Sequence, residues 1–157
     1  MVEYALTTPP GEAVIHETVL LHAPRELVWR AMTEADRFAR WWGPRRYTNR
    51  VLAMNVRPGG KWRVEQRAPS GKVFTFFGEF IEIEAPRRMV QTFAFADYPP
   101  ARIELILEPE GPDTRLRSTM QFTAVEMRDG MIGSGMEQGA REGYERLEEL
   151  LADELAK

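Results

Sequence analysis

The chain has 157 residues, of which 43% are hydrophobic and 29% charged, with a net charge of −3. These values are ordinary for a globular protein, and the length suits a single domain over residues 1–157. There is no cysteine, which excludes disulfides, thiol catalysis and thiolate metal sites. No apolar stretch approaches the roughly 20 residues of a membrane span. The first ten residues lack the basic start and apolar run of a signal peptide, so we expect a cytoplasmic protein.

Basic residues gather in the first half of the chain, with eleven Lys or Arg against four Asp or Glu between Arg25 and Arg67. Such a surface can attract an anionic partner. The arginines are scattered, however, and no recognised nucleic-acid-binding motif accompanies them. We therefore interpret them as solvated outer faces and predict no nucleic-acid partner.

The first predicted element is a strand over residues 12–22, which is rich in β-branched and aliphatic side chains. Pro24 then favours the start of a short helix. Thr33, with Asp36 three residues later, resembles a capping box and predicts the start of a second short helix. The pair Gly43-Pro44 predicts its end.

From Tyr47 onward the pattern becomes alternating, and turn signals separate five or six strand-like runs. The runs 61–67, 101–108 and 114–124 each have one apolar and one polar face, which is typical of half-buried antiparallel strands. The run 73–84 differs because both of its faces carry apolar residues. A bulge, a covered outer face or a subunit contact such as a homodimer would each explain this pattern.

The last quarter of the chain, about 130–157, predicts one long amphipathic helix. Ser134 with Glu137 resembles the N-cap pair that opens it. Gly135, Gly139 and Gly143 lie four residues apart beside its apolar stripe. Each interior glycine costs a helix about 1 kcal/mol relative to alanine. We therefore expect either a close neighbour or an open space beside these glycines.

Together these elements predict an α+β helix-grip fold. A curved antiparallel sheet of six to seven strands would wrap around the long C-terminal helix, with two short helices after the first strand. Only that last helix is long enough to cover the concave face of such a sheet, at about 1.5 Å per residue. We expect a ligand-sized gap between the helix and the sheet.

Four stretches of the chain resemble the START-like (SRPBCC) superfamily, and within it the branch named after the Hsp90 ATPase activator homologue. They are 23–31 with Thr33, 40–44, 78–86, and 135–139 with Tyr144 and Leu147. Their order and spacing cover nearly the whole chain. The resemblance implies a helix-grip fold with a deep, mostly apolar cavity. It does not imply one activity, because the superfamily includes a co-chaperone domain, lipid and hormone binders and polyketide cyclases.

The resemblance also raises an Hsp90-type chaperone as a partner. The full-length eukaryotic co-chaperone carries an additional N-terminal domain that this sequence lacks. We therefore do not expect Hsp90 activation itself.

The sequence contains none of the common catalytic, nucleotide or metal motifs. His16 and His22 lie about 20 Å apart along an ideal strand, so local geometry does not join them at a metal. We predict no metal, no cofactor and no catalytic residue. Glu65, Glu79, Glu82, Glu84 and Glu104 are expected mostly on the wet outer face, because burying an unpaired carboxylate is costly.

The aromatic and methionine side chains are the better candidates for a site, since they can line an apolar cavity. Tyr144, Trp62 and Gln66 or Gln91 could supply polar anchors. The predicted cavity residues are Trp41, Trp42, Trp62, Phe76, Gln91, Phe93, Phe95, Met120, Phe122, Met136, Gly139, Gly143 and Tyr144.

The function that follows is the binding of a hydrophobic or aromatic small molecule, without a prediction of its identity. One alternative is a cyclase- or hydrolase-type enzyme, which needs an acid inside the cavity together with a second polar group such as Tyr144. The other is an interaction module that acts on a chaperone or on a second copy, suggested by the apolar residues on both faces of 73–84.

Overall fold

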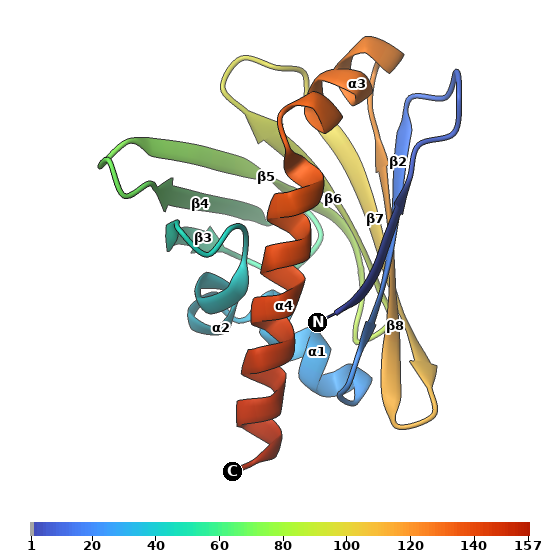
Figure 1. The fold of residues 1–157 in the computed structure, drawn as a ribbon, viewed down its shortest axis with the longest axis vertical. Helices are drawn as coiled ribbons and strands as arrows, with labels where there is room; N and C mark the ends of the chain where they lie inside the picture. The colour runs from blue at the N-terminus through green and yellow to red at the C-terminus, as the bar shows by residue number, and fades with distance from the viewer. Residues whose placement is uncertain (1) are drawn as a thin grey trace.

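A computed structural model describes residues Val2–Lys157 and confirms the α+β architecture. One antiparallel sheet curves around the long C-terminal helix α4 (Figure 1). Its eight strands follow the spatial order β1-β2-β8-β7-β6-β5-β4-β3. The strands are β1 (Glu3–Thr7), β2 (Val14–Leu21), β3 (Thr48–Met54), β4 (Lys61–Arg67), β5 (Val73–Glu84), β6 (Arg88–Phe95), β7 (Ala101–Glu110) and β8 (Asp113–Gln121).

Strand β1 is the element that the sequence pattern did not predict. It pairs with the outer edge of β2, with Tyr4 opposite Val19 and Leu6 opposite Glu17. Five residues give too little alternation to predict a strand, and the segment is held by its ladder to β2. The sheet therefore has one more strand than the upper limit we expected.

Two short helices follow β2 as predicted, α1 (Arg25–Thr33) and α2 (Ala35–Trp41). Pro24 is the residue immediately before α1. The predicted capping box is wrong, because Thr33 ends α1 and its hydroxyl donates a hydrogen bond to the Trp29 carbonyl. Glu34 precedes α2 and makes no side-chain cap.

The predicted terminal helix is two helices, α3 (Val125–Gly133) and α4 (Met136–Leu155). Gly135 stands before α4 with a φ of 85°, a left-handed conformation that favours glycine and breaks the helix. Ser134 does not cap α4, since its hydroxyl donates to the Met131 carbonyl at the end of α3. The predicted pairing of Ser134 with Glu137 is therefore wrong.

The two apolar faces of β5 are explained largely by a β-bulge. The register against β6 shifts between Phe80 and Glu82, so the inward-facing side changes phase at this point. Phe76 and Phe80 pack into the core before the bulge and Ile83 packs against it afterwards. Phe77 stays on the outer face under the Arg63 guanidinium.

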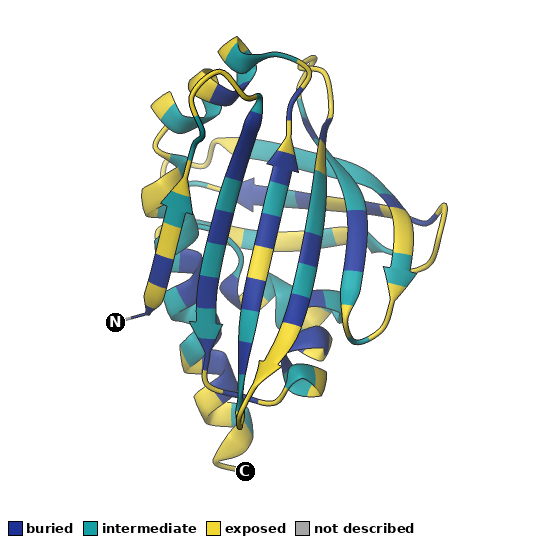
Figure 2. Cartoon of the chain, turned by 90° about the vertical axis from the view of Figure 1, so that its right-hand side faces the viewer, coloured by how far each residue is buried: buried dark blue, intermediate teal, exposed yellow. Residues whose placement is uncertain are grey.

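The core lies between the concave face of the sheet and the helices. Burial alternates along the central strands, as Figure 2 shows. In β2 the inward residues are Ile15, Glu17, Val19 and Leu21, and in β8 they include Leu116, Ser118 and Met120. From α4, Leu147 and Leu151 complete the core. Across Val2–Lys157, no helix combines the length and apolar character needed to cross a membrane.

Candidate functional site

A cavity of about 570 Å³ lies between the concave face of the sheet and helix α4. Strands β3 to β8 line it together with β2, and α2, the loop after α2 and the N-terminal half of α4 close it. Most of its lining is apolar, and its size falls within the range of small-molecule sites. The expected gap under the helix therefore exists.

One side of the cavity is an aromatic wall, formed by Trp42, Trp62, Phe76 and Phe93. Trp42 and Phe76 meet edge to face with ring centroids 5.2 Å apart, and the Phe76 and Phe93 centroids are 5.6 Å apart. Trp62 lies 5.9 Å from Phe93. Its indole N–H donates to the Thr92 carbonyl at 3.0 Å. The wall is thus a packed cluster, and Trp62 is not the free polar anchor that we predicted.

Gly139 and Gly143 of α4 allow the loop after α2 to approach the helix closely. A Cβ on Gly143 would lie 3.0 Å from the Gly43 nitrogen, and one on Gly139 would lie 3.2 Å from Pro44 Cγ. The loop after α2 therefore presses directly on the helix. Gly139 and Gly143 still line the cavity, but a close neighbour explains them rather than an empty space beside them.

The loop is held against α4 by Arg146. Its guanidinium donates hydrogen bonds to the carbonyls of Gly43 at 3.0 Å, Pro44 at 3.1 Å and Arg40 at 2.8 Å. Burial lowers the pKa of Arg146 from its ordinary value, but the group remains a cation. On the other side, the Asn49 amide donates to the Trp42 carbonyl at 2.6 Å. These bonds fix the loop that carries Trp42 into the cavity.

The opposite side of the cavity holds an acidic corner, formed by Tyr4, Glu17 and Tyr144. Glu17 is only 8% exposed and projects inward from the middle of β2. The Tyr4 hydroxyl donates to Glu17 Oε2 at 2.5 Å. The Tyr4 and Tyr144 ring centroids are 5.7 Å apart, and Trp41 stacks on Tyr144 at 6.1 Å. Glu17 and Tyr144 both line the cavity.

Burial controls the ionisation of this corner. Loss of hydration raises the pKa of the Glu17 carboxyl above its ordinary value of 4.5, and the Tyr4 hydrogen bond opposes only part of that rise. Burial, and next to it the charge of Glu17, raises the pKa of both tyrosine hydroxyls well above 10. The tyrosines are therefore neutral hydrogen-bond donors, and Glu17 is the titrating group.

The predicted cavity residues fall into two groups. All of them line the cavity except Phe95 and Phe122. Phe95 stacks on Phe76 and Tyr98 beyond the aromatic wall. Phe122 lies with Ile15 and Met120 in a second apolar cluster. Of the other predicted anchors, Gln91 lines the cavity, and the Gln66 amide donates to the Trp42 carbonyl at 3.4 Å.

The five carboxylates expected on the outer face do lie outside the cavity. Arg88 pairs with Glu82, Glu84 and Glu104, while Lys61 pairs with Glu79. His22 pairs with Glu148 on α4, and His16 contacts the Thr119 hydroxyl. Within the described part of the chain, no group of three or more His, Asp or Glu side chains could hold a metal ion.

Sequence reasoning missed Glu17, Tyr4 and Ser118 as site residues. The alternation of Ile15, Glu17, Val19 and Leu21 could have shown a carboxyl on an apolar face, but the other phase of β2 also carries apolar residues, Val14 and Leu20. Tyr4 belongs to the strand that was not predicted. Ser118 lies directly across from Glu17 on β8, and it also lines the cavity.

Comparison with known proteins decides the family. A family model described as "Activator of Hsp90 ATPase homolog 1-like protein" matches residues 22–152. The chain belongs to this family. The match contains the six strands β3 to β8, the helices α1, α2 and α3 and most of α4, whereas β1 and β2 lie outside it.

Several solved structures share the fold of this chain. A protein from Mycobacterium smegmatis superposes with a TM-score of 0.88 at 18% identity, over 96% of this chain and 97% of its own. One from Rhodobacter sphaeroides gives 0.87 at 24% identity, over 96% and 99%. One from Nitrosomonas europaea gives 0.81 at 26% identity, over 92% and 97%. No curated protein matches the chain in sequence.

Proposed function

We propose that this protein binds a hydrophobic or aromatic small molecule in the cavity between the sheet and α4. The observation that carries the proposal is the cavity itself, about 570 Å³ in volume, with an aromatic wall on one side and an acidic corner on the other. Apolar lining with a few placed polar groups is the usual design of a small-molecule site. The hydrogen bonds of Arg146 and Asn49 hold the cavity open by fixing the loop after α2.

A titration with the neutral dye Nile red tests the proposal. We expect saturable binding with a rise in fluorescence, and a rise in the melting temperature of the protein. Met136→Trp adds an indole to the lining of the cavity and should reduce binding. Leu52→Trp is the matched control, because Leu52 is 42% exposed on β3. Equal dye binding by both variants and the native protein would contradict the proposal.

A second function, a cyclase- or hydrolase-type enzyme, has one specific observation in its favour. Glu17 and Tyr144 place a buried carboxyl and a neutral hydroxyl on the same cavity, as such an enzyme requires. In that role Glu17 would take or return a proton while Tyr144 donated a hydrogen bond to a developing oxyanion. Deuterium uptake by a ketone in heavy water, lost in Glu17→Gln, is the result that would favour it.

A further inference from the structure

The Glu17 carboxyl has one oxygen committed to the protein and one facing the cavity. The hydrogen bond from Tyr4 occupies Oε2 and is the one bond made by this side chain within Val2–Lys157. Among the described residues, Arg25 Nε and Asn49 Oδ1 are the side-chain atoms sealed from solvent without a partner. The unbonded Oε1 is therefore not sealed, and Glu17 lines the cavity. This oxygen is an acceptor directed at whatever the cavity holds.

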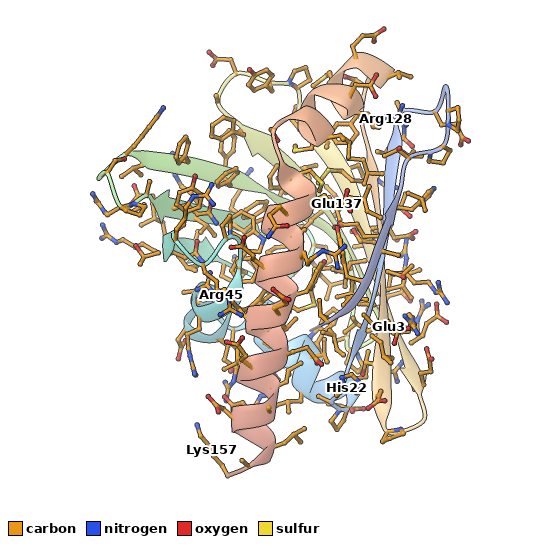
Figure 3. The ribbon with its side chains drawn as sticks, viewed as in Figure 1. Glu3, His22, Arg45, Arg128, Glu137 and Lys157 are labelled. Carbon is orange, nitrogen blue, oxygen red and sulfur yellow. The ribbon has the colours of Figure 1, made fainter. Side chains whose placement is uncertain are left out.

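No basic side chain of the described structure balances Glu17. Arg46 is the one basic residue in the cavity lining, and its guanidinium is exposed and stacked over the Tyr47 ring. On α4, Arg141 lies over the Tyr4 ring and pairs with Glu137 at 3.8 Å. Glu137, near the upper end of α4 in Figure 3, adds further negative charge close to Glu17. The corner therefore lacks a cation.

The groups around Glu17 suit a cation. The rings of Trp41 and Tyr144 stack beside the corner, and aromatic faces attract ammonium groups when water is excluded. The Ser118 side chain lies across from Glu17 and, like Tyr144, is neutral and can accept a hydrogen bond. An ammonium group needs several acceptors for its N–H donors, and the corner supplies a carboxylate and two hydroxyls.

We propose that Glu17 selects the ligand, and that the ligand is an organic amine: an apolar or aromatic body against the aromatic wall and a protonated nitrogen bonded to Glu17. This inference rests on the proposed function and names the chemical class of its ligand. The opposite polarity, in which a protonated Glu17 donates to a carbonyl or carboxylate of the ligand, predicts that the native protein binds an anion more tightly than an amine.

Three probes of one shape test the inference: naphthylmethylamine, its neutral counterpart naphthylmethanol, and the anion naphthoate. We measure the dissociation constant of each by calorimetry at about pH 8, where the amine is still largely protonated. The native protein should bind the amine about tenfold to a hundredfold more tightly than the alcohol, as expected for a charge-assisted bond. In Glu17→Gln the amine and the alcohol should bind equally.

The pH dependence supplies a second measurement that needs no variant. The affinity for the amine should rise with pH as Glu17 loses its proton, while the affinity for the alcohol should stay constant. The other groups around Glu17 do not produce this change, since burial keeps the Tyr4 and Tyr144 hydroxyls neutral and Glu137 is exposed. Arg141 carries a guanidinium group, which is always charged in proteins. Glu137→Gln is the matched control and should retain most of the preference for the amine.

Each outcome separates the inference from the proposed function. Equal binding of amine and alcohol by the native protein, or tighter binding of naphthoate, overturns the assignment of an amine as the ligand. The cavity would still be a ligand site. Persistence of the amine preference in Glu17→Gln also overturns the role of Glu17. Failure of all three probes and of Nile red overturns both. Because the Tyr4 hydroxyl can donate to the glutamine oxygen, Glu17→Gln should fold, and its melting temperature checks this.

Discussion

The two sides of the cavity differ in how they relate to the rest of the protein. The aromatic wall is continuous with the core, and its four rings contact one another as well as lining the cavity. The acidic corner depends on one carboxyl, whose one hydrogen bond within Val2–Lys157 comes from the edge strand β1. We therefore expect the wall to contribute mainly to stability, whereas in our proposal the Glu17 carboxyl of the corner provides the specific chemistry.

The largest effect should come from breaking the aromatic wall. Trp62 is 3% exposed, and truncation removes its ring and leaves the Thr92 carbonyl without its donor. We expect Trp62→Ala to lower the free energy of unfolding by about 3–5 kcal/mol, measured by urea denaturation. Tyr98→Ala is the matched control, because that ring is 65% exposed, and it should change stability by about 0.5 kcal/mol or less. Similar losses in both would show that the wall is not part of the core.

A single methyl group added where α4 contacts the loop after α2 should change the stability of the protein. Gly143→Ala places a Cβ against the Gly43 backbone, which cannot move as a flexible side chain does. We expect a loss of about 1–3 kcal/mol from overpacking, despite the better helix propensity of alanine. Gly130 lies in α3 with open space around it. Gly130→Ala should instead gain up to about 1 kcal/mol, and a gain at both sites would contradict the close approach.

Glu17 in the acidic corner should make the stability of the protein depend on pH. Burial raises the pKa of the Glu17 carboxyl in the folded protein above 4.5. The protonated carboxyl therefore contributes its full stabilisation of the fold below pH 4.5, and this stabilisation is lost as pH rises through the folded-state pKa. The glutamine in Glu17→Gln does not titrate, so the free energy of unfolding of the variant should rise relative to that of the native protein as pH increases. Urea denaturation at a series of pH values measures this difference. Parallel curves for the two proteins would mean that Glu17 is not buried as described.

The Glu148 carboxylate, which is half-buried and paired with the exposed His22 ring, provides the smallest effect and sharpens the contrast with Glu17. The hydrogen bond that the protonated His22 ring donates to the Glu148 carboxylate raises the pKa of His22 above 6.5. The pair therefore stabilises the fold below that value and loses its effect as pH rises through the folded-state pKa. His22 is 57% exposed, so Glu148→Gln should cost only about 0.2–1 kcal/mol at acidic pH. NMR titration of the His22 ring should show its pKa falling in the variant.

Sequence by itself determined the architecture of this protein. Alternation in the strands and the three-and-four spacing of α4 are local properties that any fold must respect, because they decide which face can be buried. They predicted the curved antiparallel sheet, the two short helices and the long C-terminal helix, and eleven of the thirteen cavity residues that we named line the cavity. The family resemblance pointed in the same direction.

Only the tertiary structure decided the details on which function depends. β1 exists through its ladder to β2, and it brings Tyr4 to Glu17, thirteen residues away in the chain. The approach of Gly43 to Gly143 joins segments a hundred residues apart, so local pattern could suggest a close neighbour but not identify it. Glu17 differs from the outward glutamates through burial and the absence of a paired cation. Burial and pairing are properties of the assembled fold, which no local pattern of residues contains.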